Sequence, residues 1–193
     1  MFEQILQLDE QLFSAINSGL SNTFFDWIMP LLRNRYFWTP LYLFITIFFV
    51  KNYGKQGYVL LLFFVLTFAA TDFFTATLIK PNVQRLRPCN NPEMTSTIHR
   101  VIACGTGYSF PSTHAANHFA LAVFLITVFY KKWKAILPLG VLWAGSISFA
   151  QVYVGVHYPL DVTGGALIGS MIGYVIAASL LIYKPYFSWK AGN

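Results

Sequence analysis

Long apolar runs constrain the fold of this chain more than any other feature of its sequence. They cover roughly residues 37–50, 57–79, 113–130, 135–156 and 162–183. A helix needs about 20 apolar residues to cross a bilayer, with about 17 as the lower limit. The second, fourth and fifth runs meet this length, the third is just long enough, and the first needs its flanks. The sequence therefore predicts about five membrane-spanning helices.

The composition also indicates an integral membrane protein. Charged residues make up only 10% of the chain, against about 25% in soluble domains. Its 193 residues suit a single domain. We therefore expect an all-α, polytopic helical membrane bundle over residues 1–193, with interfacial or short helices in 1–35 and a transmembrane core in 37–183. Nucleic-acid binding is not expected, because it requires a solvent-exposed basic face.

The first residues predict an amphipathic N-terminal helix. Apolar residues recur close to helical spacing within residues 2–16, while Glu3, Asp9 and Glu10 share the other side. Such a helix lies in the membrane interface or packs on the bundle, and the pattern fits both arrangements. A positively charged segment does not precede the first apolar residues, so we do not expect a cleavable signal peptide.

Basic residues in the loops predict the orientation in the membrane. Seven lysines lie in loop 51–56, in loop 131–134 and in the C-terminal tail, which carries Lys184 and Lys190. Four arginines lie on the other side, once Lys80 and Arg87 are set aside as candidate ligands. This bias favours a cytoplasmic tail in a bacterial cytoplasmic membrane, with the long loop 80–112 outside.

The two cysteines, Cys89 and Cys104, fall in this outer loop. A disulfide fits an oxidising compartment, and two free thiols fit the sequence as well. Both interpretations stay open at this point.

Three polar clusters stand at the ends of apolar runs. Ionisable residues at membrane depth are costly and usually functional. Because successive spans alternate in direction, the three clusters are expected at the same membrane face. Their members are Lys80 with Arg87-Pro88, then Pro111-Ser112-Thr113-His114, then Gln151 with His157 and Asp161.

The second and third clusters suggest chemistry on an anion. A helix that begins near Ser112 offers free N–H groups and a positive dipole end, which attract phosphate. His114 lies in its first turn, close enough to transfer a proton. His157 and Asp161 are four residues apart, so the carboxylate can fix the imidazole tautomer and leave the other nitrogen free to attack. A membrane anchor at Lys80, an ordinary helix cap and a structural His–Asp pair are the alternatives.

The combined pattern resembles the type 2 phosphatidic acid phosphatase superfamily over roughly residues 57–175. It reads Lys, six residues, Arg-Pro, then Pro-Ser-x-His, then His-x-x-x-Asp. The resemblance implies a membrane lipid phosphate phosphatase. It implies that His157 forms a phosphohistidine, that Asp161 orients it, and that His114 acts first as acid and then as base.

The resemblance also implies a phosphate-binding set. Lys80, Arg87, Ser112 and the backbone N–H of Thr113 would hold the phosphate oxygens. Gln151 stands where the family usually has an arginine, and Thr113 where it usually has a glycine. An amide still donates a hydrogen bond but brings no charge, so weaker phosphate binding is expected unless Arg85 or Arg100 compensates.

The expected substrate is a lipid phosphate or pyrophosphate, with undecaprenyl pyrophosphate favoured over phosphatidylglycerol phosphate, phosphatidic acid and a lipid A phosphate. A lipid phosphotransferase and a non-catalytic lipid-phosphate carrier are the alternatives. No metal or other cofactor is expected, because the seven acidic residues form no cluster suited to magnesium. The pair His114 and His118 has zinc-like spacing but lacks the glutamate that follows in such motifs. Asp72, within the second run, is expected to brace Lys80 or Arg87, or to pack against a neighbouring helix. The oligomeric state is left open.

Overall fold

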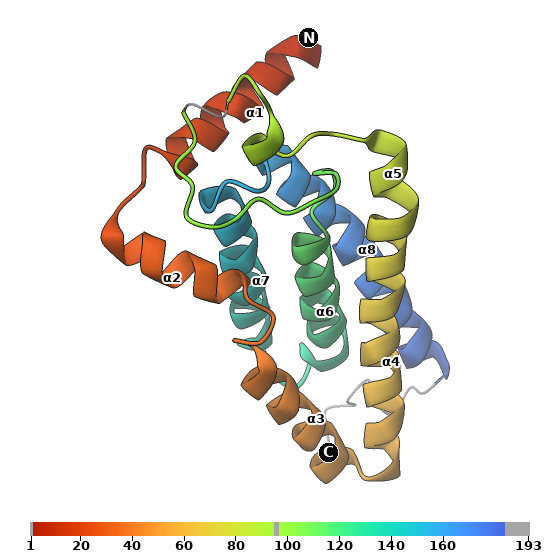
Figure 1. Cartoon of the computed structure of the whole chain (residues 1–193). Helices are drawn as coiled ribbons and strands as arrows, with labels where there is room; N and C mark the ends of the chain where they lie inside the picture. Colours follow the sequence, from red (N-terminus) through yellow and green to blue (C-terminus); the bar gives the residue numbers. More distant parts are fainter. Residues whose placement is uncertain (1, 95–96, 184–193) are drawn as a thin grey trace.

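The computed structural model describes residues 2–94 and 97–183, and this part of the chain is helical with no strands (Figure 1). The all-α prediction is therefore confirmed. The α-helices are α1 (Phe2–Asn17), α2 (Thr23–Arg33), α3 (Thr39–Tyr53), α4 (Lys55–Asp72), α5 (Lys80–Val83), α6 (Thr113–Phe129), α7 (Ile136–Tyr153) and α8 (Pro159–Tyr183). A π-helical segment, η1 (Phe73–Ile79), joins α4 to α5, and a short 3₁₀ turn, η2 (Pro88–Asn90), follows.

Three helical stretches of the described chain are long and apolar enough to cross a membrane. They are Lys55–Asn90, Ile136–Tyr153 and Pro159–Tyr183, while Thr113–Phe129 is a shorter apolar helix. The total of about five spans remains a prediction. Lys184 and Lys190, which contribute to the expected orientation, lie outside the described residues.

Helix α6 occupies the centre of the bundle, with α4, α7 and α8 around it (Figure 1). Three glycines of α8, Gly165, Gly169 and Gly173, face the backbone of α6. A Cβ atom at any of them would overlap with a carbonyl oxygen of α6 or of its N-cap, Ser112. Small residues at such spacing let two helices approach closely in a membrane. The two histidine motifs, which lie at the starts of α6 and α8, are thereby held together.

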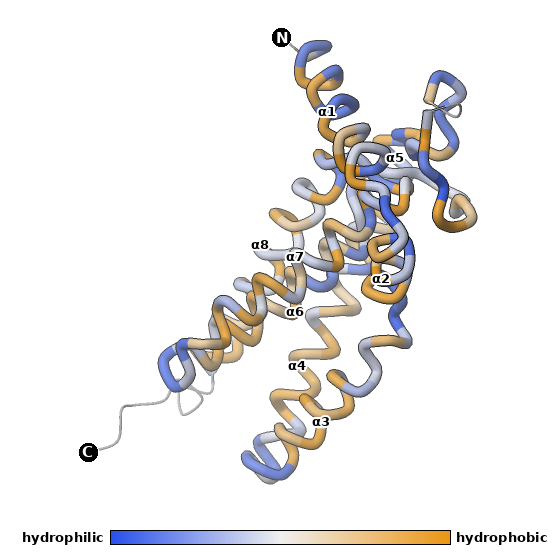
Figure 2. Tube along the Cα trace, turned by 90° about the vertical axis from the view of Figure 1, so that its left-hand side faces the viewer, coloured by the Kyte–Doolittle hydropathy of each residue, from blue (hydrophilic) through white to orange (hydrophobic). Residues whose placement is uncertain are grey.

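Away from the polar loops, aromatic side chains fill the space between α3, α4 and α6. The ring of Phe49 packs against Phe129 and Phe64, with centroids 5.8 and 5.9 Å apart. Figure 2 shows hydrophobic residues along these helices, whereas hydrophilic residues gather in the loops at their ends. The polar loop segments 84–94 and 97–112 lie at the same end as α1 and α2 (Figure 1).

Helix α1 packs on α7 and α8 through its C-terminal half. Phe13 is fully buried against Tyr158, and Asn17 donates hydrogen bonds to the backbone oxygens of Tyr153 and His99 at 2.6 and 2.9 Å. Asp9 departs from the polar side expected for it, because it is 2% exposed. Packing on the bundle is therefore the interpretation that fits this half of the helix.

Candidate active site

A cavity of about 720 Å³ opens between α2, α3, α4, α6 and the loops above them. Ser112 and Asp161, two of the eight predicted site residues, lie outside its lining. The other six line it together, although they come from distant parts of the sequence: Lys80, Arg87, Thr113, His114, Gln151 and His157.

Backbone carbonyl groups of the loops hold Lys80 and Arg87, the two cations of the first polar cluster. Lys80 donates from Nζ to the backbone oxygens of Tyr108 and Ser109 at 2.8 and 3.3 Å. Arg87 donates to the backbone oxygens of Gly107 and Val156 at 3.3 and 3.2 Å. Because carbonyls orient these groups without neutralising them, both cations keep their charge for an anion in the cavity.

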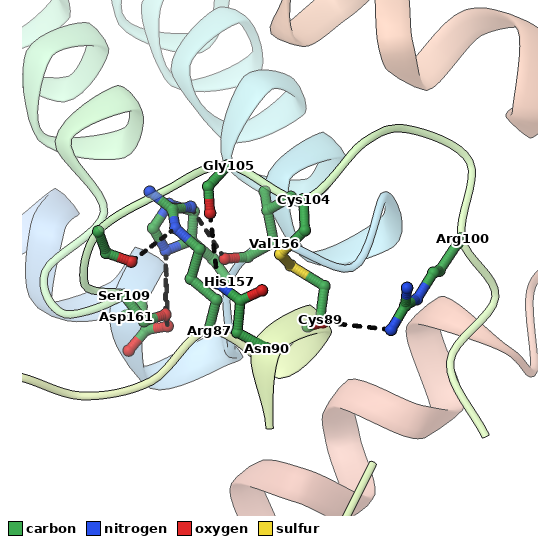
Figure 3. The surroundings of a disulfide bond; sticks show 11 residues. Arg87, Cys89, Asn90, Arg100, Cys104, Gly105, Ser109, Val156, His157 and Asp161 are labelled. Carbon is green, nitrogen blue, oxygen red and sulfur yellow. Dashed lines mark hydrogen bonds and ion pairs between the residues drawn. A yellow bond between two sulfur atoms is a disulfide. The ribbon is translucent and has the colours of Figure 1, made fainter. Parts of the chain in front are cut away.

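The two ring nitrogens of His157 face different groups (Figure 3). Its Nδ1 faces a carboxylate oxygen of Asp161 at 3.5 Å, and its Nε2 lies 3.3 Å from a guanidinium nitrogen of Arg87. Gly155, with φ at 86°, makes the turn that follows α7 and brings His157 to the cavity. Burial lowers the pKa of His157 to about 4, against the opposing effect of Asp161. The ring is therefore neutral at pH 7.

Asp161 is fixed from several directions. Its oxygens accept hydrogen bonds from Arg85 at 2.8 Å, from the backbone N–H of Tyr158 at 2.8 Å, and from the hydroxyl of Ser109. Arg85 also binds Asp9 at 2.6 Å, so one guanidinium joins α1 to the start of α8. The carboxylate has no exposed surface, and this network holds it in one orientation beside His157.

Neither arginine expected to compensate for Gln151 is in a position to do so. Arg85 is engaged by two carboxylates. Arg100 donates to the backbone oxygen of Cys89 at 3.3 Å and does not line the cavity (Figure 3). The expectation of compensation by Arg85 or Arg100 is therefore not met.

The second polar cluster, Pro111-Ser112-Thr113-His114, lies at the start of α6. Ser112 is the N-cap, and its hydroxyl oxygen accepts from the backbone N–H of Ala115 at 3.4 Å. Its burial behind the cavity wall fits a capping role better than direct contact with a ligand. His114 lines the cavity, while its backbone oxygen accepts from Nδ1 of His118 at 2.7 Å. Nε2 of His118 then accepts from the hydroxyl of Tyr42 at 3.0 Å.

The cavity wall is strongly cationic. Arg33, Arg35, Lys80 and Arg87 line it, whereas Asp72 is its one acidic residue among those described. Asp72 accepts a hydrogen bond from Asn117 of α6 at 3.0 Å. Of the two arrangements expected for Asp72, this contact is the packing against a neighbouring helix. Such an excess of positive charge in a partly buried cavity favours an anionic ligand.

Cys89 and Cys104 form a disulfide, which decides between the two states that the sequence left open. The bridge lies near Arg87 and Val156 (Figure 3), and Cys104 directly precedes loop residues 105–108, which line the cavity. It closes a segment of 15 residues.

Sequence reasoning missed three residues of the site. Ser109 and Asp9 hold Asp161 directly or through Arg85. Arg33 lines the cavity but was counted only as a loop charge. No motif marks these residues, because each reaches the site through packing between distant segments.

Comparison with known proteins agrees with this geometry. The family model described as the PAP2 superfamily matches residues 58–182. A lipid A 4'-phosphatase of Bacteroides thetaiotaomicron is 36% identical over 91% of this chain and 78% of its own length. An undecaprenyl-diphosphatase of Sulfolobus acidocaldarius is 33% identical over 90% of this chain and 79% of its own. The crystal structure of a PAP2-type phosphatidylglycerolphosphate phosphatase from Bacillus subtilis superimposes with a TM-score of 0.71 at 22% identity, over 95% of this chain and 89% of that one.

Proposed function

Because the chain belongs to the PAP2 superfamily of membrane lipid phosphatases, we propose that it hydrolyses a lipid phosphate through a covalent intermediate on His157. The observation that carries this proposal is that the two ring nitrogens of His157 face an acidic and a basic residue. Its Nδ1 faces Asp161 at 3.5 Å, and its Nε2 faces the cationic cavity beside Arg87 at 3.3 Å. A carboxylate on one nitrogen fixes the tautomer that leaves the other nitrogen free for attack.

In the proposed reaction, the Nε2 lone pair of His157 forms a bond to phosphorus as the bond between phosphorus and the lipid oxygen breaks. The leaving oxygen takes a proton from the imidazolium form of His114, which thereby becomes neutral. His114 then removes a proton from water, whose oxygen attacks phosphorus while the N–P bond breaks. The electron pair returns to Nε2, and inorganic phosphate leaves.

The phosphate oxygens are met by fixed positive groups. Lys80 and Arg87 supply charge, and the N–H of Thr113 and the amide of Gln151 supply neutral donors. Preoriented donors of this kind stabilise the charge that develops in a transition state. Ser112, whose oxygen caps α6, is assigned to positioning that donor helix and not to direct contact with the phosphate.

For the substrate, we place a lipid A phosphate first. The relative named lipid A 4'-phosphatase supports this order, because it is 36% identical over 91% of the chain. Undecaprenyl pyrophosphate, the substrate favoured from the sequence alone, is the second candidate, supported by the relative named undecaprenyl-diphosphatase. Both present a phosphate at the membrane surface, where the cationic cavity would meet it.

The site is proposed to face the outside of the cell. The lysines of loop 131–134 support this orientation through the bias of basic residues toward the cytoplasm. A cysteine introduced at Thr106 should react with a membrane-impermeant maleimide in intact cells, whereas one at Lys131 should not. The reverse labelling pattern would place the site on the cytoplasmic side.

The decisive experiment is phosphate release from a panel of lipids by the purified full chain in detergent. Lipid A and undecaprenyl pyrophosphate are the first two substrates, and His157→Ala should abolish release. His99→Ala is the matched control, since His99 binds Asp26 at 2.8 Å and does not line the cavity. A carrier would give no release from any lipid, and a phosphotransferase would give a second phosphorylated lipid instead of inorganic phosphate.

A further inference from the structure

Gln151 presents an unused amide to the cavity. Its side chain is fully buried on α7, and neither its Oε1 nor its Nε2 has a hydrogen-bond partner within the described residues. Buried polar side chains are nearly always paired. Since Gln151 lines the cavity, its amide is free to bind a ligand there. The amide carries no charge, so this wall of the cavity lacks a cation of its own.

Arg33, the last residue of α2, faces the same cavity. Its Nε is buried without a hydrogen-bond partner, and no carboxylate of the described chain lies within ion-pair distance of it. Burial and the neighbouring charge of Arg87 lower the pKa of Arg33, although an arginine stays protonated at any physiological pH. A cation buried without a counter-charge is costly, so an anion that entered the cavity would be favoured beside Arg33.

The other arginines of the chain are all engaged. Arg35 donates to the hydroxyl of Tyr36 at 3.2 Å. Arg85 binds two carboxylates, Arg87 binds backbone oxygens, and Arg100 binds the backbone oxygen of Cys89. Arg33 is thus the one arginine for which the described residues supply neither a hydrogen-bond acceptor nor a carboxylate.

The fold holds Arg33 at this place through the packing of α2 on α7. Tyr153, two residues after Gln151, donates to Asp26 of α2 at 2.7 Å, and its ring meets Phe25 edge-on at 5.6 Å. Trp38 donates from its indole to the backbone oxygen of Leu32 at 2.7 Å, which fixes the end of α2. The guanidinium therefore points into the cavity from a supported helix end. It lines the same cavity as His114 and Arg87.

We propose that Arg33 is a phosphate-binding residue, which brings from α2 the positive charge that Gln151 does not bring from α7. The ligand is the phosphate of a lipid head group, and the inference rests on the function proposed above. A guanidinium can bind two phosphate oxygens at once, and the amide of Gln151 completes the contact with a neutral donor. Because α2 precedes the residues matched by the family model, this chain draws part of its phosphate site from outside that region.

Inorganic phosphate is the probe for this proposal. Its Kd for the purified full chain is obtained from the rise of the melting temperature with phosphate concentration. Arg33→Gln should weaken phosphate binding about tenfold or more. Arg33→Lys should weaken it less, because an ammonium keeps the positive charge but cannot make the bidentate hydrogen bonds of a guanidinium. Arg100→Gln is the control, since Arg100 does not line the cavity, and it should leave Kd within about twofold.

A second variant separates binding from mere structural support. Gln151→Arg, placed in the Arg33→Gln background, moves the charge from α2 to α7 across the same cavity. It should return Kd to within about threefold of the original value. An unchanged Kd in Arg33→Gln, or a loss that neither Arg33→Lys nor Gln151→Arg reduces, would overturn the assignment.

The two proposals fail in different ways. If the original chain releases phosphate from no lipid, the proposed function fails, yet the phosphate Kd of the Arg33 variants still reports on this residue. If the lipid assay shows His157-dependent release with identical kcat/KM in the original chain and Arg33→Gln, the role of Arg33 fails alone.

Discussion

Replacing Arg85 with methionine should destabilise the protein strongly. Arg85 bridges Asp9 and Asp161 at 2.6 and 2.8 Å, and the two carboxylate side chains are only 1% and 0% exposed. Removing one partner of a buried ion pair costs about 3–5 kcal/mol, because a buried charge is left uncompensated. For a chain of this length, each kcal/mol corresponds to about 2–4 °C in Tm. Arg85→Met should therefore lower Tm by about 6–20 °C.

The measurement is thermal unfolding of the purified full chain in detergent, followed by circular dichroism. Arg100→Met is the matched control, because Arg100 contacts a backbone oxygen and no carboxylate. Its Tm should change by less than about 2 °C, in line with a loss below ~1 kcal/mol.

A double-mutant cycle identifies the cause of the loss. In the background of Asp9→Asn, which removes one of the two carboxylates, Arg85→Met should cost about 1–3 kcal/mol less than it does alone. Strictly additive changes in Tm, or an Arg85→Met variant as stable as the Arg100 control, would refute the reasoning that the guanidinium neutralises two buried acids.

Three further changes test the site. Burial lowers the pKa of His157 to about 4 from 6.5, so between these pH values the unfolded chain binds more protons than the folded chain. The stability that neutral His157 contributes is therefore complete above about pH 6.5 and is lost as the pH falls toward 4. If the Tm of the original chain and of His157→Gln depended on pH in the same way, this reasoning would be contradicted. Cys104→Ser opens a bridge across 15 residues and should cost about 3 kcal/mol, with the same Tm loss when the original chain is reduced. Asp161→Asn should lower kcat about 10³–10⁴-fold, as for the carboxylate of a serine protease triad; steady-state kinetics that show less than a tenfold loss would exclude an orienting role.

The residues that the sequence predicted correctly as neighbours share one property. Lys80, Arg87, His114 and His157 lie at the ends of long apolar runs, and all four line one cavity. A helical run has a known rise per residue, so residues at its end are placed at a membrane face by the chain itself. Their convergence follows from alternation of the runs, which needs no knowledge of side-chain packing.

The residues that the sequence did not predict depend on packing between distant segments. Asp9 reaches Asp161 only because α1 lies against the start of α8 and Arg85 joins them. Arg33 reaches the cavity only because α2 packs on α7. Periodicity marks a buried face but does not specify which helix covers it, so a charge at the end of a short helix resembles an ordinary loop charge.

The glycines of α8 have a consequence for how variation in this chain affects its activity. Gly165, Gly169 and Gly173 touch no proposed ligand, yet they set the separation between the axes of α6 and α8. His114 travels with the first of these helices, and Asp161 with the second. One added methyl group at Gly169 would push the axes apart and shift His114 relative to Asp161, although the methyl group touches neither residue. Substitutions of these glycines should therefore leave the hydropathy of α8 almost unchanged but lower the turnover of the protein.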